Sequence, residues 1–461
     1  MGAPHVKQGG VMRKLSFAQK MIVSLVSGLV IGLGFLLLRQ QLNAHNPAAW
    51  VSINQLLFVD ITAEGNESAL GLFYIVGQVF VRLLQLVIVP MVFTSITLAM
   101  VHIKDTEKLG RISFKTIKGF LVNSIAALLM ASVIGYIVMK LGWFNVSELA
   151  IEGATGSTGS NPLNVLLSMF PNNLVGTFTS NTSVLAVVFL AVSLGLILNR
   201  YHEELTVVQK LVEEVNKIVS VFLNYVIQTL APVSVAVLLI RTIASYGIDY
   251  LKPAAIYMLV TTFSLIIFLT IGYALFIRIM AKLNPMPFVR KISEVAIFGF
   301  STSSSAATLP LNMKVTQEEL GVDTDITSFV LPLGMTINMN GTAIMQVIAS
   351  IFVASSAGYE LSYWNILTIA TLALVASVGT PAAPGAGGVI LFTILSGMGY
   401  SNPAALATYA LILAINRPIE MLVTSLNVVG DSATAIYVAN SEGQLDTKAY
   451  FNQENEHVVE V

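Results

Sequence analysis

Residues 363–399 read YWNILTIATLALVASVGTPAAPGAGGVILFTILSGMG, in which two apolar halves are separated by a run of prolines and glycines. A helix that faces lipid cannot be broken in this way, because hydrocarbon offers no partner to the freed backbone N–H and C=O groups. Such a break is tolerated only where it faces protein or a water-filled cavity. The stretch therefore predicts a re-entrant helical hairpin, which enters and leaves the membrane on one side. The alternative is one kinked span with ordinary packing of small residues.

A second interrupted stretch lies at residues 290–312. Its core, FGFSTSSSAATLPLN (298–312), places five hydroxyl side chains in a row, from Ser301 to Ser305, between apolar sequence and Pro310. Two discontinuous segments in the later part of a chain are the best sequence indication of a transporter's binding site. We therefore expect this stretch to form another re-entrant hairpin.

The composition of the whole chain is typical of an integral membrane protein. Its 461 residues are 55% hydrophobic and only 11% charged, and the mean hydropathy is +0.79. A soluble domain carries about 25% charged residues. The net charge of −1, without a basic block, gives no indication of a nucleic-acid partner. The absence of cysteine excludes disulfides, thiolate zinc sites and iron–sulfur clusters.

Most Lys and Arg residues gather in alternate connections between the apolar stretches. They cluster at 7–20, 104–118 and 278–291 and are absent from 41–70 and 141–196. Because basic residues mark cytoplasmic loops, the pattern predicts a multi-pass protein with both ends, 1–16 and 441–461, in the cytoplasm. A span needs about 20 apolar residues. The eight expected spans are 17–39, 70–101, 114–140, 183–198, 217–246, 253–282, 326–355 and 402–440.

The seventh expected span contains LPLGMTINMNGTAIMQ (331–346), in which Gly334, Asn338, Asn340 and Gly341 interrupt an apolar helix. Local unwinding would free backbone carbonyl oxygens, which are the hard ligands that suit a small cation. The alternative is that the two asparagines hold neighbouring helices together.

The eighth expected span carries four polar residues on one helical face. Glu420, Thr424, Asn427 and Asp431 are spaced at i, i+4, i+7 and i+11. Charged side chains within a membrane are costly and by default indicate function. The alternative is that Arg417 and Glu420 merely neutralise each other as an i, i+3 pair.

Six motifs follow one another along the chain: FVRLLQLVIVPMVFTSI (80–96), LGRISFK (109–115), STSSSAATLP (301–310), LPLGMTINMNGTA (331–343), SVGTPAAPGAG (377–387) and NVVGDSATA (427–435). In this order they resemble the dicarboxylate/amino acid:cation symporter family, the glutamate transporter homologues, and the resemblance covers nearly the whole chain. It implies a homotrimeric, sodium-driven transporter with eight transmembrane helices and two re-entrant hairpins.

The resemblance also implies a division into two domains that move as an elevator. The scaffold comprises residues 17–101 and 183–246, and the second of these segments forms the trimer contacts. The transport domain comprises residues 114–140 and 253–440, with the hairpins 290–312 and 363–399.

By resemblance, three groups of residues form the site. The substrate-binding residues are Ser303, Ser304, Ser305, Thr342, Ala383, Gly387, Arg417, Glu420, Thr424 and Asn427. The sodium ligands are Gly334, Asn338, Asn427 and Asp431 at one ion, and Thr336, Met339, Ser377, Val378 and Thr380 at another. A third sodium would involve Phe120, Asn123, Ser124 and Asn340. The tip from Pro384 to Gly387 would be the extracellular gate.

Two positions depart from the pattern of family members that carry acidic amino acids. Val423 stands where those members have an Arg, one turn after the acid that holds the amino group, which is Glu420 here. A substrate side-chain carboxylate would therefore be desolvated without a partner. Asn340 replaces an Asp, which weakens the case for a third sodium.

The sequences of the motifs most resemble those of the bacterial L-cystine uptake branch of the family. In that interpretation Glu420 holds the near ammonium group and Arg417 meets the distal carboxylate of cystine. The expected location is the bacterial cytoplasmic (inner) membrane. The open alternatives are small neutral or acidic amino acids and C4-dicarboxylates, of which the last would be repelled by Glu420.

Two other classes of protein fit the sequence less well. An enzyme would need a nucleophile with a base, a metal cluster or a phosphate-binding loop, and the spans contain no His. We therefore expect no enzymatic activity and no cofactor other than coupling ions. A channel also uses broken helices, but Glu420 and Asp431 within the membrane favour stoichiometric coupling.

Overall fold

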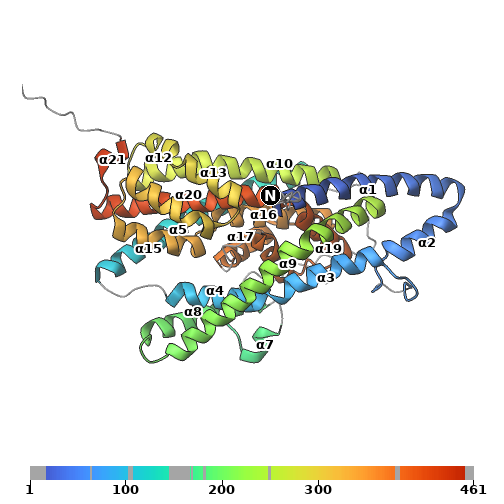
Figure 1. Ribbon diagram of the computed structural model, residues 1–461, viewed down its shortest axis with the longest axis horizontal. Coiled ribbons are helices and arrows are strands. Elements are labelled where there is room, and N and C mark those ends of the chain that lie inside the picture. Colours follow the sequence, from blue (N-terminus) through green and yellow to red (C-terminus); the bar gives the residue numbers. More distant parts are fainter. Residues whose placement is uncertain are drawn as a thin grey trace, which may run out of the picture.

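The computed structural model describes residues 17–62, 65–101, 107–144, 167, 170–179, 183–247, 251–378, 380 and 385–451. Among these residues the regular secondary structure is entirely helical, apart from one isolated backbone bridge between Val322 and Leu445. The molecule is elongated, and several long helices run along it (Figure 1). The prediction of an all-helical fold is confirmed for the described residues. The amino-terminal segment 1–16 lies outside the described residues.

The described part of the first half of the chain contains helices that range from 5 to 41 residues. They are α1 (Phe17–His45), α2 (Pro47–Leu57), α3 (Leu72–Leu86), α4 (Ile88–Val101), α5 (Glu107–Lys140), α7 (Leu174–Phe178), α8 (Val184–Arg200) and α9 (Thr206–Tyr246). The sequence did not indicate α2. It begins where the Asn46 side chain accepts a hydrogen bond from the backbone N–H of Ala49, with Pro47 in its first turn.

The second half begins with one long helix that contains π-helical turns: α10 (Leu251–Ile267), η3 (Phe268–Gly272), α11 (Tyr273–Phe276) and η4 (Ile277–Ala281). The next elements are α12 (Met286–Lys291), α13 (Ser293–Thr302), α14 (Ser305–Lys314), η5 (Val315–Glu319), α15 (Thr324–Ile337) and α16 (Asn340–Ser356). The last are α17 (Tyr363–Val378), α18 (Ala386–Gly397), α19 (Pro403–Ile415), α20 (Arg417–Glu442) and α21 (Thr447–Phe451).

Seven helical segments of the described chain are long and apolar enough to cross a membrane. Two of the eight expected spans differ from the prediction. The stretch 183–198 corresponds to α8, whose apolar part is shorter than those seven. The stretch 402–440 is two helices, α19 and α20, of which only α20 is long enough. The break falls before Pro418, which has no N–H to continue α19 but fits the first turn of α20.

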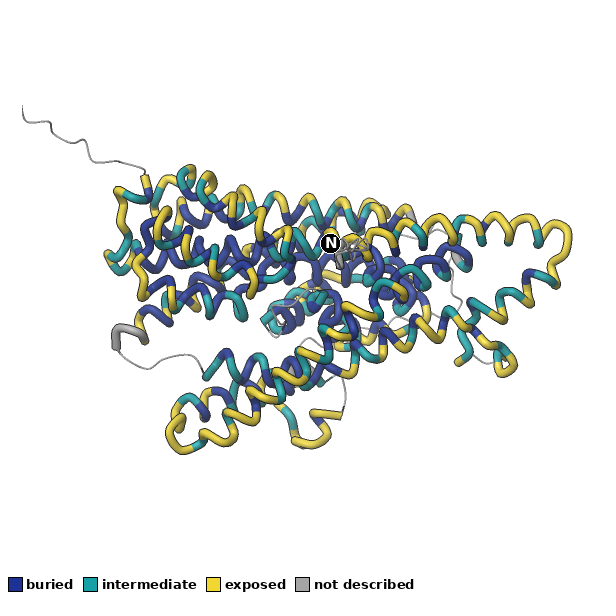
Figure 2. Tube along the Cα trace, in the orientation of Figure 1, coloured by how far each residue is buried: buried dark blue, intermediate teal, exposed yellow. Residues whose placement is uncertain are grey.

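The helices pack into two groups. In one, α1, α3 and α4 lie against α9, and α8 lies against α4. In the other, α5, α10, α13 to α15, α17 and α18 surround α16 and α20, which are buried over most of their length (Figure 2). Helix α19 packs on both α9 and α16 and so touches both groups. The assignment of these groups to a scaffold and a moving transport domain stays a prediction.

Both interrupted stretches are helix–turn–helix units whose arms pack together, α13 on α14 and α17 on α18. In the first, Ser303 between the arms has a left-handed backbone with φ of 50°. In the second, Gly385 opens α18 with φ of 84°. Residues 381–384 of its tip, including Ala383 and Pro384, lie outside the described residues. The seventh span is interrupted at Asn338 and Met339, between α15 and α16.

The carboxyl-terminal segment docks on the base of the first hairpin. The backbone N–H of Asp446 donates to Gly321 O over 2.7 Å, beside the Val322–Leu445 bridge. From the end of α12, Lys291 Nζ donates to the carbonyls of Glu319, Ala449 and Tyr450 at 2.8, 2.7 and 3.1 Å. Part of the expected cytoplasmic tail is therefore an ordered piece of the helical bundle.

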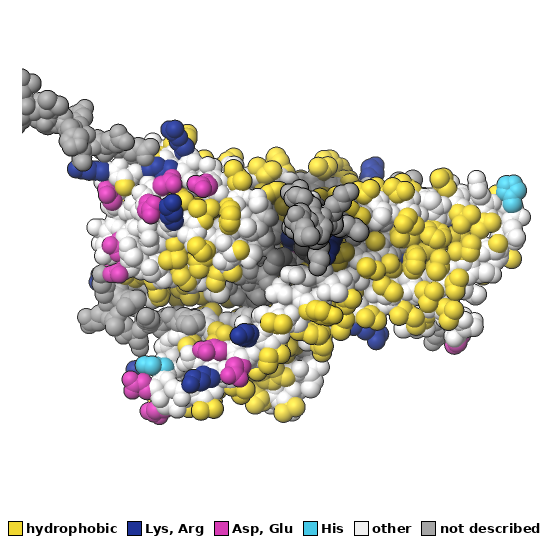
Figure 3. Space-filling view, viewed as in Figure 1, with side chains coloured by type: hydrophobic (Ala, Val, Ile, Leu, Met, Phe, Trp, Pro, Cys, Tyr) yellow, Lys and Arg dark blue, Asp and Glu magenta, His cyan; other side chains and the backbone are white. Residues whose placement is uncertain are grey.

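Charged side chains concentrate at one end of the molecule, around α12 and α21, and near the outer ends of α8 and α9, whereas the flank over α1 and α2 is covered with hydrophobic side chains (Figure 3). On α1, Ile22, Val30 and Leu37 are each about 60% exposed. Such surfaces would be unfavourable in water and are natural where lipid surrounds the protein.

A candidate substrate and cation site

A buried polar centre joins the break in the seventh span to the middle of α20. Asn338 Nδ2 donates to Asp431 Oδ1 over 2.8 Å and to the backbone carbonyl of Asn427 over 3.3 Å. Gly334 lies directly against this carboxylate, since a Cβ there would collide with Asp431 Oδ1. The four residues expected at one cation are thus brought together, and Asp431 is their only charged member.

A chain of neutral side chains continues from this centre toward α5. Asn340 Nδ2 donates to Asn338 Oδ1 over 2.8 Å and to Tyr273 Oη over 3.1 Å. In turn, Ser124 Oγ donates to Asn340 Oδ1 over 2.7 Å. Each bond satisfies a buried polar atom, as burial requires. The side chain of Asn340, which stands where other family members have an Asp, is therefore hydrogen-bonded on both its oxygen and its nitrogen.

The other two residues expected at a third sodium have different surroundings. Asn123 Nδ2 points to Thr434 Oγ1 at 3.4 Å. The ring of Phe120 lies beside Gly334, with Cζ 2.9 Å from where a Cβ would stand. Of the four residues expected at this ion, only Ser124 and Asn340 are joined by a hydrogen bond among the described residues, whereas Asn123 contacts Thr434 instead.

The five residues expected at the remaining sodium are less closely connected. The hydroxyls of Thr336, Ser377 and Thr380 each donate to a carbonyl three or four residues earlier in their own segment. Among the described residues, no side-chain hydrogen bond runs from Thr336 to Ser377, Val378 or Thr380. Met339 Sδ instead accepts from Asn427 Nδ2 over 3.3 Å. Sulfur is a soft donor, so backbone carbonyls would have to supply most of such a site.

Glu420 lies between the start of α18 and Arg417. The backbone N–H of Gly388, in the first turn of α18, donates to Glu420 Oε1 over 3.3 Å. Arg417 Nη1 lies 3.7 Å from Glu420 Oε2. A helix amino terminus favours an anion, so the second hairpin holds this carboxylate on one side and the guanidinium holds it on the other. Gly388 was not predicted.

Asn427 connects α20 to the start of α16. Its Oδ1 accepts from the backbone N–H of Gly341 over 2.8 Å, and its Nδ2 donates to Thr342 Oγ1 over 3.3 Å. The approach of the two helices is close, because a Cβ on Gly341 would stand 2.8 Å from Val423 O and 3.1 Å from Val423 Cα. One amide thus links the residues expected at the substrate to those expected at the cation.

The tip of the first hairpin combines backbone strain with an unsatisfied side chain. Ser303 is 2% exposed, adopts a left-handed backbone that side chains rarely occupy, and has an Oγ with no hydrogen-bond partner among the described residues. Ser304 caps α14 by accepting from the backbone N–H of Ala307, and Ser305 is buried in the first turn. Strained residues and orphaned polar atoms are concentrated at ligand sites.

A small cavity of about 40 Å³ separates Glu420 from the other group of helices. On one side lie Gly385, Arg417 and Glu420, and on the other lies an apolar wall from α1, α3 and α9. The cavity is large enough for water but not for an amino acid. Its complete lining is Met21, Phe80, Leu84, Ile227, Ala231, Val235, Gly385, Val389, Leu413, Arg417 and Glu420.

Three further polar residues belong to the site but were not predicted. Tyr273 accepts from Asn340, Gln346 Nε2 donates to Gly387 O over 3.2 Å, and Asn416 Oδ1 accepts from Tyr257 Oη over 2.8 Å. Gln346 and Asn416 were visible as amides within apolar spans. Tyr273 could not be singled out from the sequence, because tyrosines are common in membrane helices, above all near their ends. Thr424 has its hydroxyl bonded to Glu420 O over 3.0 Å.

Two helical hairpins that pack beside an interrupted helix, with carboxylates in the interior, are the arrangement expected of a membrane transporter with discontinuous helices. A sequence model of the Sodium:dicarboxylate symporter family matches residues 17–441. The chain belongs to this family, which is made up of symporters.

Named relatives cover most of the chain at low identity. The proton/glutamate-aspartate symporter of Escherichia coli K12 is 28% identical over 394 residues, which are 82% of this chain and 87% of the relative. The C4-dicarboxylate transport protein of Deinococcus deserti is 27% identical over 376 residues, covering 80% and 84%. The excitatory amino acid transporter of Caenorhabditis elegans is 26% identical over 419 residues, covering 80% and 82%. These relatives are named for glutamate and aspartate, for C4-dicarboxylates and for excitatory amino acids.

Proposed function

We propose that this protein is a sodium-coupled symporter that imports an amino acid, with L-cystine as the preferred substrate, across the bacterial cytoplasmic membrane. It would work as a homotrimer in which the α16–α20 group carries the site past the α1–α9 group. Family membership supports the transport class. The substrate and the coupling ion rest on the arguments that follow.

The observation that carries cation coupling is the surroundings of Asp431. Its side chain is 2% exposed and forms no ion pair with any described residue. Its hydrogen-bond donor is the neutral amide of Asn338. A buried carboxylate without an opposite charge is unfavourable by several kcal/mol. A bound sodium ion would compensate that charge, and the contacts of Gly334 and Asn338 with Asp431 place further oxygen-bearing residues beside it.

An amino group on the substrate is supported by Glu420. The Asn416 side chain hydrogen-bonds to this carboxylate, whereas two other contacts, from Gly388 N–H and Arg417 Nη1, are long, at 3.3 and 3.7 Å. An ammonium group could replace either contact at little cost. The charges of Glu420 and Arg417 already balance each other. A dicarboxylate would add two negative charges to them.

L-cystine is favoured by the combination of Arg417 and Val423. Val423 is buried and apolar, so the α20 surface one turn from Glu420 offers nothing to a short acidic side chain. Arg417 lies on the other side of Glu420, toward the apolar wall of the cavity. A substrate with a second zwitterion at a distance could place its far carboxylate on Arg417. Since the cavity is too small for it, the second hairpin or the opposing wall must first withdraw.

A second candidate is an acidic amino acid or a C4-dicarboxylate, because the named relatives carry these substrates. In that case Arg417 would be the counterion of the substrate side-chain carboxylate. The E. coli relative is also named for proton coupling, so a proton is the alternative coupling ion.

Counterflow in liposomes tests both candidates. Purified protein is reconstituted, loaded with unlabelled L-cystine, L-glutamate, L-serine or succinate, and supplied with the labelled compound outside, with sodium or with choline. We expect L-cystine exchange that saturates and requires sodium. Equal or faster exchange of glutamate or succinate would overturn the substrate assignment. Exchange that needs a pH gradient but no sodium would overturn the ion assignment.

A further inference from the structure

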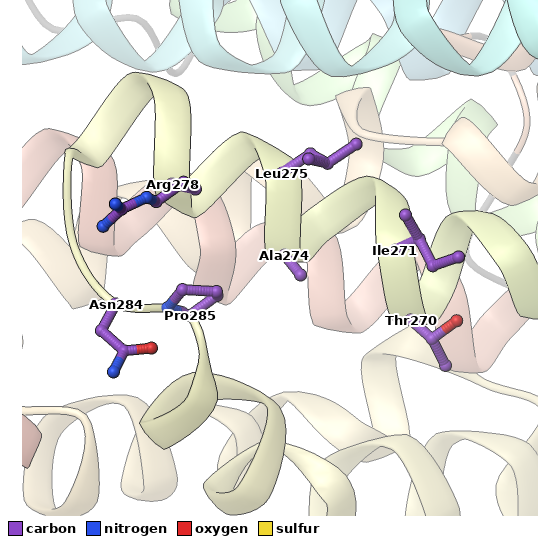
Figure 4. Close-up of a pocket in the computed structure, with 7 residues that line it drawn as sticks. All are labelled: Thr270, Ile271, Ala274, Leu275, Arg278, Asn284 and Pro285. Atoms are coloured by element: carbon purple, nitrogen blue, oxygen red, sulfur yellow. The ribbon is translucent and has the colours of Figure 1, made fainter.

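A large open cavity lies away from the site described above, beside the end of the helix formed by α10, η3, α11 and η4. Its volume is about 550 Å³. One wall is the helix from Thr270 to Arg278, and the other is the turn at Asn284 and Pro285 that leads into α12 (Figure 4). Arg278 and Asn284 lie at one end of the cavity, whereas Thr270 and Ile271 lie at the other. The cavity is thus basic at one end and mainly apolar at the other.

The apolar end continues a surface that faces lipid. Phe263, Ile271 and Leu275 are 61%, 55% and 52% exposed on the same helix, within a segment long and apolar enough to span the membrane. The hydroxyl of Thr270 donates to Ile266 O over 2.7 Å and so is not available to a ligand as a donor. This part of the cavity is suited to a hydrocarbon chain.

The π-helical turns align the residues of this wall. In a regular α-helix of 3.6 residues per turn, residues four apart drift steadily around the axis. The wider turns of η3 and η4 oppose that drift. Thr270, Ala274 and Arg278 therefore line one groove, with Ile271 and Leu275 along its edge.

The polar end offers donors for an anion. Arg278 is exposed and makes no hydrogen bond or ion pair with any other described residue. The Asn284 oxygen accepts from the backbone N–H of Met286 over 3.1 Å, which leaves the amide N–H groups as donors. Lys282 and Arg290 are exposed and close in sequence to Asn284, so the connection that forms this end carries further positive charge. The distribution of basic residues predicts that this end faces the cytoplasm.

We propose that this cavity binds one anionic phospholipid. Its phosphate is held by the Arg278 guanidinium and the Asn284 amide, and an acyl chain lies along Ile271 and Leu275. A guanidinium suits phosphate because its planar donors match two oxygens at once. Basic pockets at the cytoplasmic ends of spans are the usual sites for anionic headgroups.

The lipid would act on the base of the first hairpin. The turn at Asn284 joins η4 to α12 and α13, and Tyr450 Oη donates to Asn284 O over 2.9 Å. Asn440 Nδ2, from α20, donates to Ala281 O over 2.8 Å at the end of η4. Holding this turn therefore stabilises contacts with both α20 and the docked carboxyl-terminal segment, which predicts a higher unfolding temperature in the lipid-bound protein.

The test uses the full-length protein in mixed micelles that contain phosphatidylglycerol or phosphatidylcholine. Bound lipid is counted by native mass spectrometry, and the unfolding temperature is followed over the same titration. We expect phosphatidylglycerol to bind roughly 5-fold more tightly than phosphatidylcholine, which corresponds to one basic contact. Arg278→Gln should abolish that preference. Lys210→Gln is the matched control, because it removes an exposed basic residue of α9 away from the cavity.

A second variant tests the groove without changing charge. Ala274→Phe fills the wall between Thr270 and Arg278 and should lower binding of both lipids. Inorganic phosphate alone should neither bind measurably nor raise the unfolding temperature. The proposal is overturned if the two lipids bind equally, if Lys210→Gln loses the preference as Arg278→Gln does, if Ala274→Phe binds both lipids as the wild type does, or if phosphate alone reproduces the stabilisation.

Discussion

Asn338 and Asp431 are joined by a hydrogen bond of 2.8 Å from Nδ2 to Oδ1, which connects the unwound centre of one span to the middle of another. Because the donor is neutral, the bond orients the carboxylate without balancing its charge. Movement of a cation to or from Asp431 would therefore act directly on the junction of α15, α16 and α20.

Asp431→Asn should weaken the response to sodium far more than the fold. The substituted amide can still accept from Asn338, whereas the charge that attracts the ion is lost. We expect the sodium concentration for half-maximal uptake, and for half-maximal thermal stabilisation, to rise at least about 10-fold. Asp325→Asn, on an exposed residue of α15, is the control and should leave both unchanged. Unaltered sodium dependence in Asp431→Asn would remove this residue from the cation site.

Glu420→Gln should reduce substrate affinity by roughly 10- to 100-fold, since a charge-assisted hydrogen bond to the amino group is replaced by a neutral one. Gly388 can still donate to the remaining oxygen, so the second hairpin should keep its contact. Affinity is measured by competition in the counterflow assay. Normal affinity would mean that Glu420 serves only to neutralise Arg417.

Arg417→Gln should discriminate between substrates by length. If Arg417 meets a distal carboxylate, the affinity for L-cystine should fall roughly 10-fold or more, while any binding of L-serine should be unaffected. Arg417→Lys retains the charge and should keep part of the affinity. An equal loss for both amino acids would assign Arg417 to the support of Glu420 alone.

Val423→Arg should lower L-cystine transport and create binding of aspartate or glutamate. The new guanidinium would lie one turn from Glu420 and could pair with a short acidic side chain. Val423→Met adds bulk without charge, so it separates the effect of side-chain size from the effect of the guanidinium charge. A sodium-dependent rise in unfolding temperature shows that the Arg variant has kept its ion site. Tight binding of aspartate by the wild type would contradict the argument from Val423.

Gly341→Ala should destabilise the protein, because the added Cβ meets the backbone of Val423 at 2.8 and 3.1 Å rather than a flexible side chain. Overpacking of this kind costs about 1–3 kcal/mol. Gly34→Ala is the matched control, since no atom lies within 4 Å of its Cβ position on α1. The unfolding temperature should fall in the first variant and stay level or rise in the second. Equal stability of the two would show that α16 and α20 can separate without cost.

The sequence was most informative where it violates the requirements of a lipid-facing helix. Prolines, glycines and amides at 298–312, 331–346 and 363–399 indicated all three interruptions, because each is intolerable in hydrocarbon unless protein or water covers it. The break at Pro418 was missed, since the surrounding residues are apolar enough to resemble one continuous span.

The partners of the site residues could not be predicted in the same way. Tyr257 and Asn416 are bonded across 159 positions of sequence, and Ser124 and Asn340 across 216. Nothing local to either residue specifies its partner, because the contact depends on how distant helices pack. The resemblance supplied the list of residues, and the packing determined which of them meet.

The backbone pairing of Val322 with Leu445 has a consequence for the order of synthesis. The first hairpin emerges from the ribosome well before the segment that docks on its base. At about 5–20 residues per second, the roughly 120 residues between the two partners require about 6–25 s. During that interval the carbonyl groups of Ala449 and Tyr450 do not yet exist as acceptors for Lys291. The base of the first hairpin therefore lacks these contacts until residues 445–450 have been synthesised.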